Sequence, residues 1–197
     1  MKRGITHLLL PIAALLLPLF FNSCGSTRVD DRNKMIVSVR DQRMLLLRDG
    51  KPVKSYKIST SKFGVGDIPN SNRTPLGRMR VAKKIGGGEP AGAVFKSRRP
   101  TGEVLKPNSP GRDPIVSRIL WLTGTQSANR NAFKRFIYIH GTPEMYRLGS
   151  PASYGCIRMG TRDVVDLYNR VGTGADVYVI RGSLRQQDKP LFETAAR

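Results

Sequence analysis

His140 and Cys156 are the two side chains in this sequence whose types and spacing can do covalent chemistry. They lie in one stretch, HGTPEMYRLGSPASYGCIRM, which runs from residue 140 to residue 159. The only other histidine, His7, and the only other cysteine, Cys24, lie in or just after an apolar N-terminal segment. If that segment is removed or only anchors the chain, thiol–imidazole chemistry in the folded part must use His140 and Cys156.

An imidazole is the kind of base that a cysteine nucleophile needs. An unperturbed thiol has a pKa of about 8.5, so only a few per cent of it is thiolate near pH 7. An imidazole, with a pKa of about 6.5, can accept the thiol proton and later return it to a leaving amine. We therefore interpret His140 as general base and acid and Cys156 as nucleophile. On residue types alone, a buried structural thiol and a hydrogen-bonded histidine stay open as the alternative.

The residues around the pair suit such a site. Gly141 permits close backbone approach after His140, and Gly155 permits a tight turn that exposes the sulfur. Backbone N–H groups in this turn can form an oxyanion hole, worth about 3–4 kcal/mol per donor. Arg158 lies two residues beyond Cys156, so in an extended segment its side chain points to the same side and can pair with a substrate carboxylate. One histidine and one cysteine do not make the usual metal ligand set, so we expect neither metal nor cofactor.

The elements that must position the pair are mostly strands. Short β-rich or alternating runs predict strands over residues 35–39, 44–47, 53–59, 77–85, 115–123, 136–140 and 177–180. Asp49-Gly50 predicts a hairpin turn, and residues 60–75 a loop. His140 would end its strand, which is a rigid place from which to aim a ring. Many short strands predict a mainly β fold, a sandwich or a barrel.

One helix and one long irregular segment complete the pattern. Thr161 can cap a predicted helix with apolar spacing over residues 164–168, which Gly172 ends. Residues 86–114 open with three glycines and contain five prolines. We expect this segment to cover part of a cleft, with Val94-Phe95 adding a short strand. A disordered surface insertion is the alternative.

Residues 1–23 have the composition of a secretory signal. Basic residues precede an apolar run from Leu8 to Phe21, which is short for a spanning helix. The run ends before Ser23-Cys24, which resembles a bacterial lipoprotein signal with cleavage before a lipid-modified cysteine. An uncleaved anchor and an ordinary secreted chain are the alternatives. In each case the folded part works outside the cytoplasm, where unpaired thiols are often oxidised. We divide the remainder into a tether (24–33), a folded domain (34–182) and a polar tail (183–197).

The chain is strongly basic, with a formal net charge of +20. Removing residues 1–23 takes away two basic residues and no acidic one, which leaves +18. A field of this sign attracts polyanions and anionic lipid head groups. We expect no nucleic-acid partner, because a secreted protein rarely meets DNA and no basic helix or finger organises the charge. An anionic envelope or wall polymer fits better, and a basic surface without a specific ligand is the alternative.

The stretch from His140 resembles the catalytic signature of the L,D-transpeptidase family, also called the YkuD domain. In that family a His-Gly is followed a dozen or so residues later by Ser/Thr-His-Gly-Cys, and often by Ile/Val-Arg. Here twelve residues, 141–152, separate His140 from Ser153. Residues 74–79, TPLGRM, also resemble the Thr-Pro-x-Gly-x-Phe segment of the family. The resemblance spans about residues 35–181, with one departure: Tyr154 stands where most members have histidine.

The resemblance implies a fold, a reaction and a set of site residues. The fold is an L,D-transpeptidase-type β-sandwich or barrel with one helix after the catalytic cysteine. The substrates are peptidoglycan stem peptides, in which Cys156 attacks the carbonyl of the diamino acid before a terminal D-alanine. D-Alanine leaves with a proton from His140, and the acyl-thioester passes to an amine acceptor. The implied site residues are Cys156, His140, Gly141, Ser153, Tyr154, Gly155 and Arg158.

Each of the lesser site residues has an implied role. The Gly141 carbonyl orients His140, and Ser153 shapes the turn and donates a hydrogen bond. Backbone N–H groups of residues 154–156 are the oxyanion candidates, and Arg158 holds the substrate. The departure at Tyr154 leads us to expect reduced or altered activity before none.

Three other functions are weighed against this one. Water as acceptor would make the protein an L,D-carboxypeptidase. A non-catalytic, peptidoglycan-binding lipoprotein of the same fold would explain Tyr154 and the high charge. A wall endopeptidase with cysteine first and histidine later is disfavoured, because no histidine follows Cys156. We expect a bacterial envelope location, periplasmic, with a lipid anchor to the membrane at Cys24.

Overall fold

A computed structural model describes residues 29–185 of the chain. The predicted signal, the lipidation site at Cys24 and the tail beyond residue 185 lie outside these residues. Within the described range, no helix is long and apolar enough to cross a membrane.

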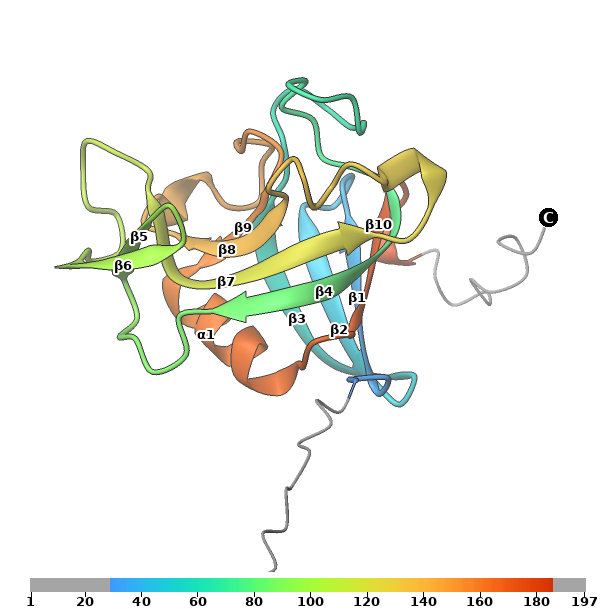
Figure 1. Cartoon of the computed structure of the whole chain (residues 1–197), viewed down its shortest axis with the longest axis horizontal. Helices are drawn as coiled ribbons and strands as arrows, with labels where there is room; N and C mark the ends of the chain where they lie inside the picture. The colour runs from blue at the N-terminus through green and yellow to red at the C-terminus, as the bar shows by residue number, and fades with distance from the viewer. Residues whose placement is uncertain (1–28, 186–197) are drawn as a thin grey trace, which may run out of the picture.

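The described residues form a single sheet that closes on itself. Its strands are β1 Asn33–Ser38, β2 Arg43–Arg48, β3 Lys51–Ser59, β4 Gly77–Ile85, β5 Ala93–Lys96, β6 Arg99–Val104, β7 Ile115–Gly124, β8 Tyr138–Thr142, β9 Ile157–Gly160 and β10 Asp176–Ile180. They are ordered β4-β10-β1-β2-β3-β9-β8-β7-β5-β6, and β4 also pairs with β7. This last pairing closes eight strands into a barrel, which the β5–β6 hairpin extends beyond β7 (Figure 1). The mainly β fold is therefore confirmed.

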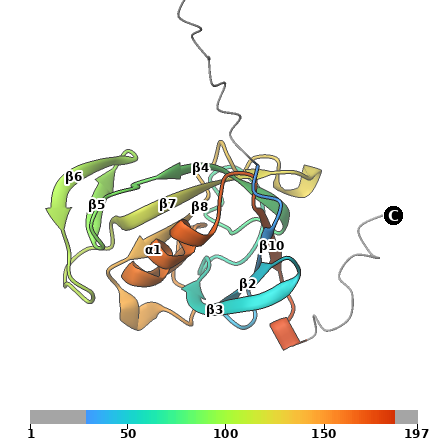
Figure 2. The same ribbon diagram turned by 90° about the horizontal axis from the view of Figure 1, so that it is seen from below.

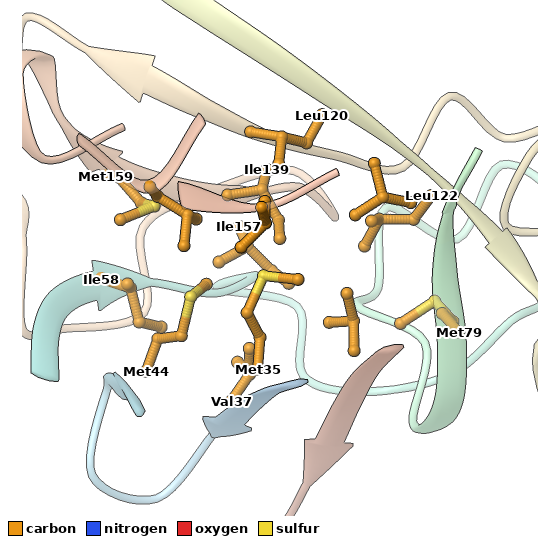
Figure 3. Packing of buried hydrophobic residues seen from close by; sticks show 14 of the residues in the cluster. Met35, Val37, Met44, Ile58, Met79, Leu120, Leu122, Ile139, Ile157 and Met159 are labelled. Atoms are coloured by element: carbon orange, nitrogen blue, oxygen red, sulfur yellow. The ribbon is translucent and has the colours of Figure 1, made fainter. Parts of the chain in front are cut away.

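A core of aliphatic and methionine side chains fills the inside of the closed sheet. Alternating residues of each strand point inward, so Met35 and Val37 of β1 meet Ile139 of β8 and Ile157 of β9 across it (Figure 3). These side chains are at most a few per cent exposed. Each contributes about 1.5–3 kcal/mol by leaving water. Packing of Ile139 and Ile157 in this core thus holds β8 and β9, which carry the site on their other face.

One α-helix, α1 Thr161–Arg170, packs against β7, β8 and β9 (Figure 2). Its buried side chains include Val164 and Leu167. Thr161 was predicted to cap the helix, but it is the first helical residue, and the N-cap is Gly160. The chain turns from β9 directly into α1, which leaves no position for a side-chain cap.

The segment 86–114 is more regular than its composition predicts. Residues 93–104 form the β5–β6 hairpin, whose turn residues Ser97 and Arg98 have φ values of 49° and 67°. Two consecutive positive φ values are typical of a tight hairpin turn, but this turn lacks the Asn-Gly sequence that usually announces one. The irregular part, 105–114, lies against the residues after β8, where the Asn108 N–H donates to the Pro143 carbonyl over 2.7 Å.

Two strand predictions near the site need correction. The strand predicted over 136–140 begins only at Tyr138, because Phe136 has a φ of 55° and belongs to a turn. β9 was not predicted at all. It has only four residues, which lie between β3 and β8, and their alternation of apolar and polar side chains is too short to predict a strand.

The ends of the predicted tether and tail are docked on the domain. β1 begins at Asn33, and the Asp30 N–H donates to the Thr173 carbonyl over 2.8 Å. At the other end, the Leu184 N–H donates to Asp41 over 2.7 Å. The folded domain therefore reaches a few residues beyond 34–182 on both sides.

Candidate active site

Parallel pairing of β8 and β9 brings the histidine and the cysteine to one face of the sheet. His140 lies opposite Arg158, and Ile139 lies opposite Ile157. Because side chains alternate along a strand, the two isoleucines enter the core while His140 and Arg158 emerge on the other face. Cys156 is two residues before Arg158 and emerges there as well.

The predicted residues converge on one small cavity. It has a volume of about 140 Å³, and it is lined by Asp113, Ile115, His140, Ser153, Tyr154, Cys156 and Arg158. The imidazole and the sulfur thus share a hollow, although they are 16 positions apart in sequence. Gly141 and Gly155 do not line the cavity but shape the backbone beside it.

The His140 ring is oriented by its own neighbour. Its Nδ1 lies 2.8 Å from the Gly141 carbonyl oxygen. A carbonyl only accepts, so Nδ1 carries the proton and Nε2 keeps a lone pair for use as a base. Burial lowers the pKa of His140, with Asp113 and Arg158 acting in opposite directions. The ring is therefore neutral at pH 7.

Gly141 is glycine because β7 approaches too closely for any side chain. A Cβ at this position would lie 2.5 Å from the Val116 carbonyl oxygen and 3.0 Å from Val164 of α1. Backbone on one side and the buried helix on the other cannot give way. The close approach holds the carbonyl that orients His140.

The Cys156 sulfur is half-buried and hydrogen-bonded to the backbone that precedes β8. It accepts from the Tyr138 N–H and donates to the Phe136 carbonyl, both over 3.4 Å. It packs against an aromatic cluster that includes Trp121 and Tyr138. Burial raises the pKa of the thiol to about 11. The thiol is therefore neutral at pH 7, and a role as nucleophile would require a base.

Ser153 and Thr74 hold the turn that leads to the nucleophile. The Ser153 hydroxyl donates to the Cys156 carbonyl over 2.5 Å and accepts from the Gly155 N–H over 3.2 Å. Thr74, from the TPLG segment, donates to the Gly155 carbonyl over 3.0 Å. Gly155 itself has a φ of 118°, which favours glycine. Because Ser153 occupies the Gly155 N–H, the oxyanion candidates that remain are the N–H groups of Tyr154 and Cys156.

Arg158 lies at the cavity but is already paired with two carboxylates. Its side chain is 3% exposed, and its Nη1 forms ion pairs with Asp113 and, at 3.1 Å, with Glu144. Asp113 comes from the irregular segment 105–114 and Glu144 from the turn after β8. Sequence reasoning missed both, since nothing in the local sequence signals a partner 45 residues away.

Tyr154 forms part of the cavity wall and is otherwise exposed. Its hydroxyl accepts from Lys62 Nζ over 3.0 Å, and that ammonium lies 4.4 Å from the ring centroid. Lys62 lowers the pKa of the phenol. The ring also contacts Phe63, at 5.5 Å between centroids. This chain therefore carries a phenol–lysine pair at the position where the signature usually has a second imidazole.

A larger cavity lies on the other side of Tyr154. It measures about 420 Å³, and its lining includes Asn70, Asn72, Asn131 and Lys134. Tyr154 thus separates the hollow that holds the nucleophile from a roomier, polar one. In the described part of the chain, no three His, Cys, Asp or Glu side chains are grouped to hold a metal ion.

Comparison with known proteins identifies the family of the chain. A family model for the L,D-transpeptidase catalytic domain, YkuD, matches residues 32–179. The chain belongs to that family. No curated protein matches it at a significant level.

Solved structures show the same fold. L,D-transpeptidase 3 from Mycobacterium tuberculosis is 18% identical, over 76% of this chain and 61% of its own, with a TM-score of 0.50. An L,D-transpeptidase from Mycobacterium smegmatis is 16% identical, over 76% of this chain and 58% of its own, with a TM-score of 0.49. The chain therefore spans less than two thirds of the length of these structures.

Proposed function

We propose that this protein is a cysteine-dependent peptidoglycan L,D-transpeptidase of the bacterial cell envelope. The observation that carries the proposal is the shared cavity of His140 and Cys156, with the imidazole oriented by the Gly141 carbonyl. A neutral base beside a neutral thiol is the arrangement that general-base activation of a cysteine requires.

The first half of the reaction forms an acyl-thioester. His140 Nε2 takes the thiol proton as the sulfur attacks the carbonyl carbon of the diamino acid in the stem peptide. A carbon–sulfur bond forms, and the N–H groups of Tyr154 and Cys156 stabilise the oxyanion. The carbon–nitrogen bond to D-alanine then breaks, and its amine leaves with the proton held by His140.

The second half transfers the acyl group. An acceptor amine attacks the thioester while His140 removes one of its protons. A new carbon–nitrogen bond forms, the carbon–sulfur bond breaks, and the proton returns to the thiolate of Cys156. The 420 Å³ cavity, which Tyr154 also lines, offers the acceptor a polar approach. Water in place of the amine would give an L,D-carboxypeptidase.

The proposal places the domain close to a membrane surface. If Cys24 carries lipid, only residues 25–29 separate it from Asp30, which is docked on the domain. A chain of that length spans at most about 20 Å. The enzyme would then act on wall strands next to the membrane, and its basic surface would favour anionic envelope polymers.

Acylation of the nucleophile tests the function directly. A carbapenem should add its mass to the intact protein at Cys156, and muropeptides should yield a crosslinked dimer, an exchanged D-amino acid or a trimmed tripeptide. A Cys156→Ala variant should lose all of these with little loss of stability. If stability falls together with activity, the cysteine is structural.

A non-catalytic wall-binding lipoprotein is the second candidate, favoured by the raised pKa of Cys156 and by the phenol at Tyr154. It predicts tight binding of wall fragments with no carbapenem adduct. The two experiments together separate the candidates.

A further inference from the structure

The Arg158 guanidinium has one paired edge and one unpaired edge. Nη1 contacts Asp113 and Glu144, whereas Nε and Nη2 are buried and have no hydrogen-bond partner among the described residues. A buried N–H without an acceptor destabilises the folded protein, because it has lost its hydrogen bond to water. Arg158 lines the cavity of His140 and Cys156, although Nε and Nη2 themselves are covered. A rotation of the guanidinium toward the cavity would let an oxygen of a bound donor peptide accept from this edge.

The charges around Arg158 are already balanced. Glu144 also pairs with Arg147, at 3.2 Å, so two guanidinium groups face the two carboxylates Asp113 and Glu144. His140 is neutral because it is buried. Lys62 keeps its positive charge at Tyr154, but it is exposed to solvent and lies outside the buried cluster. A carboxylate that entered here would bring an uncompensated negative charge into a buried cluster, which is costly. A carbonyl oxygen would accept the same hydrogen bonds without that charge.

We infer that Arg158 recognises a neutral carbonyl oxygen of the donor peptide and not a carboxylate, so that the site accepts stems whose diamino acid is amidated as readily as stems with the free acid. This inference rests on the proposed function and replaces the expectation, drawn from the sequence, that Arg158 pairs with a substrate carboxylate. The site then selects the donor peptide by its fit to the cavity and by hydrogen bonds to its backbone, and not by the charge of the diamino acid.

Binding to an inactive protein tests the inference. Full-length protein with Cys156→Ser is titrated calorimetrically with two tetrapeptide stems that differ only in a free or amidated side-chain carboxylate on the third residue. Salt at about 0.3 M screens the long-range field. The two Kd values should agree within about threefold. Adding Arg158→Lys should weaken both to the same extent, by about 10- to 100-fold, because lysine cannot present the same pair of donors.

The control is Arg147→Lys, which keeps the charge at the exposed end of the cluster and should change neither Kd by more than about twofold. A preference above tenfold for the free-acid peptide overturns the inference. This comparison uses the Cys156→Ser protein with Arg158 intact, so it does not depend on how an Arg158 variant folds. No effect of Arg158→Lys, or binding of neither peptide, overturns it too. Carbapenem acylation of the unmodified protein is measured in parallel. If the carbapenem adduct forms but neither peptide binds, the inference is wrong and the proposed function stands. If the peptides bind but the protein forms no adduct and turns over no muropeptide, the proposed function is wrong.

Discussion

At the scale of single residues, burial sets the protonation of both reacting groups. It raises the pKa of Cys156 and lowers that of His140, so the resting pair is neutral at pH 7. In the proposed reaction the thiolate forms only when the imidazole accepts the thiol proton during attack. Because the thiolate is the form that is oxidised, a neutral resting thiol limits oxidation of Cys156 outside the cytoplasm.

Alkylation of Cys156 should therefore rise steadily with pH. The folded-state pKa is about 11, so the thiolate fraction grows about tenfold per unit between pH 7 and 10. The rate of modification by iodoacetamide is followed by mass in a Cys24→Ser protein, where Cys156 is the only thiol. A rate that levels off near pH 8.5 would show a solvated thiol and contradict the burial seen here.

We expect Tyr154 to contribute to substrate binding through its ring, which lines both cavities, and not through its hydroxyl. The hydroxyl accepts a hydrogen bond from Lys62 and the residue is 63% exposed, so we expect the oxygen to take no part in the reaction. Tyr154→Phe should change kcat/KM by no more than about threefold, since exposed polar contacts contribute little. Tyr154→Ala removes a wall of both cavities and should raise KM. A large loss of kcat in Tyr154→Phe would instead give the phenol a direct part in catalysis.

At the scale of elements, the site depends on how closely β7, β8 and α1 pack. Gly141→Ala places a methyl group 2.5 Å from the Val116 carbonyl oxygen, so β8 must move away from β7. We expect a loss of about 1–3 kcal/mol in the free energy of unfolding. Acylation should fall by more than stability explains, because the carbonyl that orients His140 moves. Urea denaturation and the carbapenem adduct rate check this, and normal acylation would contradict it.

Helix α1 is tied to β3 by one carboxylate. Asp166 accepts from the buried Tyr56 hydroxyl over 2.7 Å and from Lys54 over 3.0 Å, and Arg170 donates to its other oxygen over 2.9 Å. Arg170 first, then Tyr56 and Lys54, lower the pKa of Asp166 below 3.8. Its stabilising effect is therefore present above pH 3.8 and is lost as the pH falls through the depressed folded-state value.

Asp166→Asn should lower the free energy of unfolding by about 1–3 kcal/mol at pH 7. The difference from the unmodified protein should shrink as the pH drops below about 4, because the unfolded state then takes up the proton. Chemical denaturation at pH 7 and at pH 3 measures both. Asp163→Asn, in the first turn of the same helix, is the matched control and should cost at most about 1 kcal/mol. An equal effect of the two variants would rule out the tie to β3.

At the scale of the whole molecule, a short tether and a high positive charge act together. Lipid on Cys24 would hold the domain within reach of the membrane, and the charge would hold it against anionic polymers. Cys24→Ala should release the protein from the membrane fraction of cells, whereas Cys156→Ala should leave it there. Immunoblotting of fractions checks this. Retention of the Cys24→Ala protein would point to an uncleaved anchor.

Residue types and hydrophobic patterns predicted the candidate pair and most strands of the barrel. Apart from His7 in the apolar leader and Cys24 directly after it, the chain has one histidine and one cysteine, so these were the candidate base and nucleophile. Polar–apolar alternation predicted the strands that have one solvent face. The alternation in β9 covers only four residues, which is too short to predict a strand. Turn composition did not predict the β5–β6 hairpin, because its Ser97-Arg98 turn lacks the usual Asn-Gly.

The groups that surround the pair could be identified only in the folded chain. Asp113 and Glu144 meet Arg158 through contacts between segments far apart in the chain, and Ser153 takes the Gly155 N–H from the set of oxyanion donors. Local sequence records which groups a residue carries and how its strand alternates. Local sequence does not record which charged residues are buried beside a given side chain. At this site those residues are Asp113 and Glu144, and they decide whether Arg158 can pair with another anion.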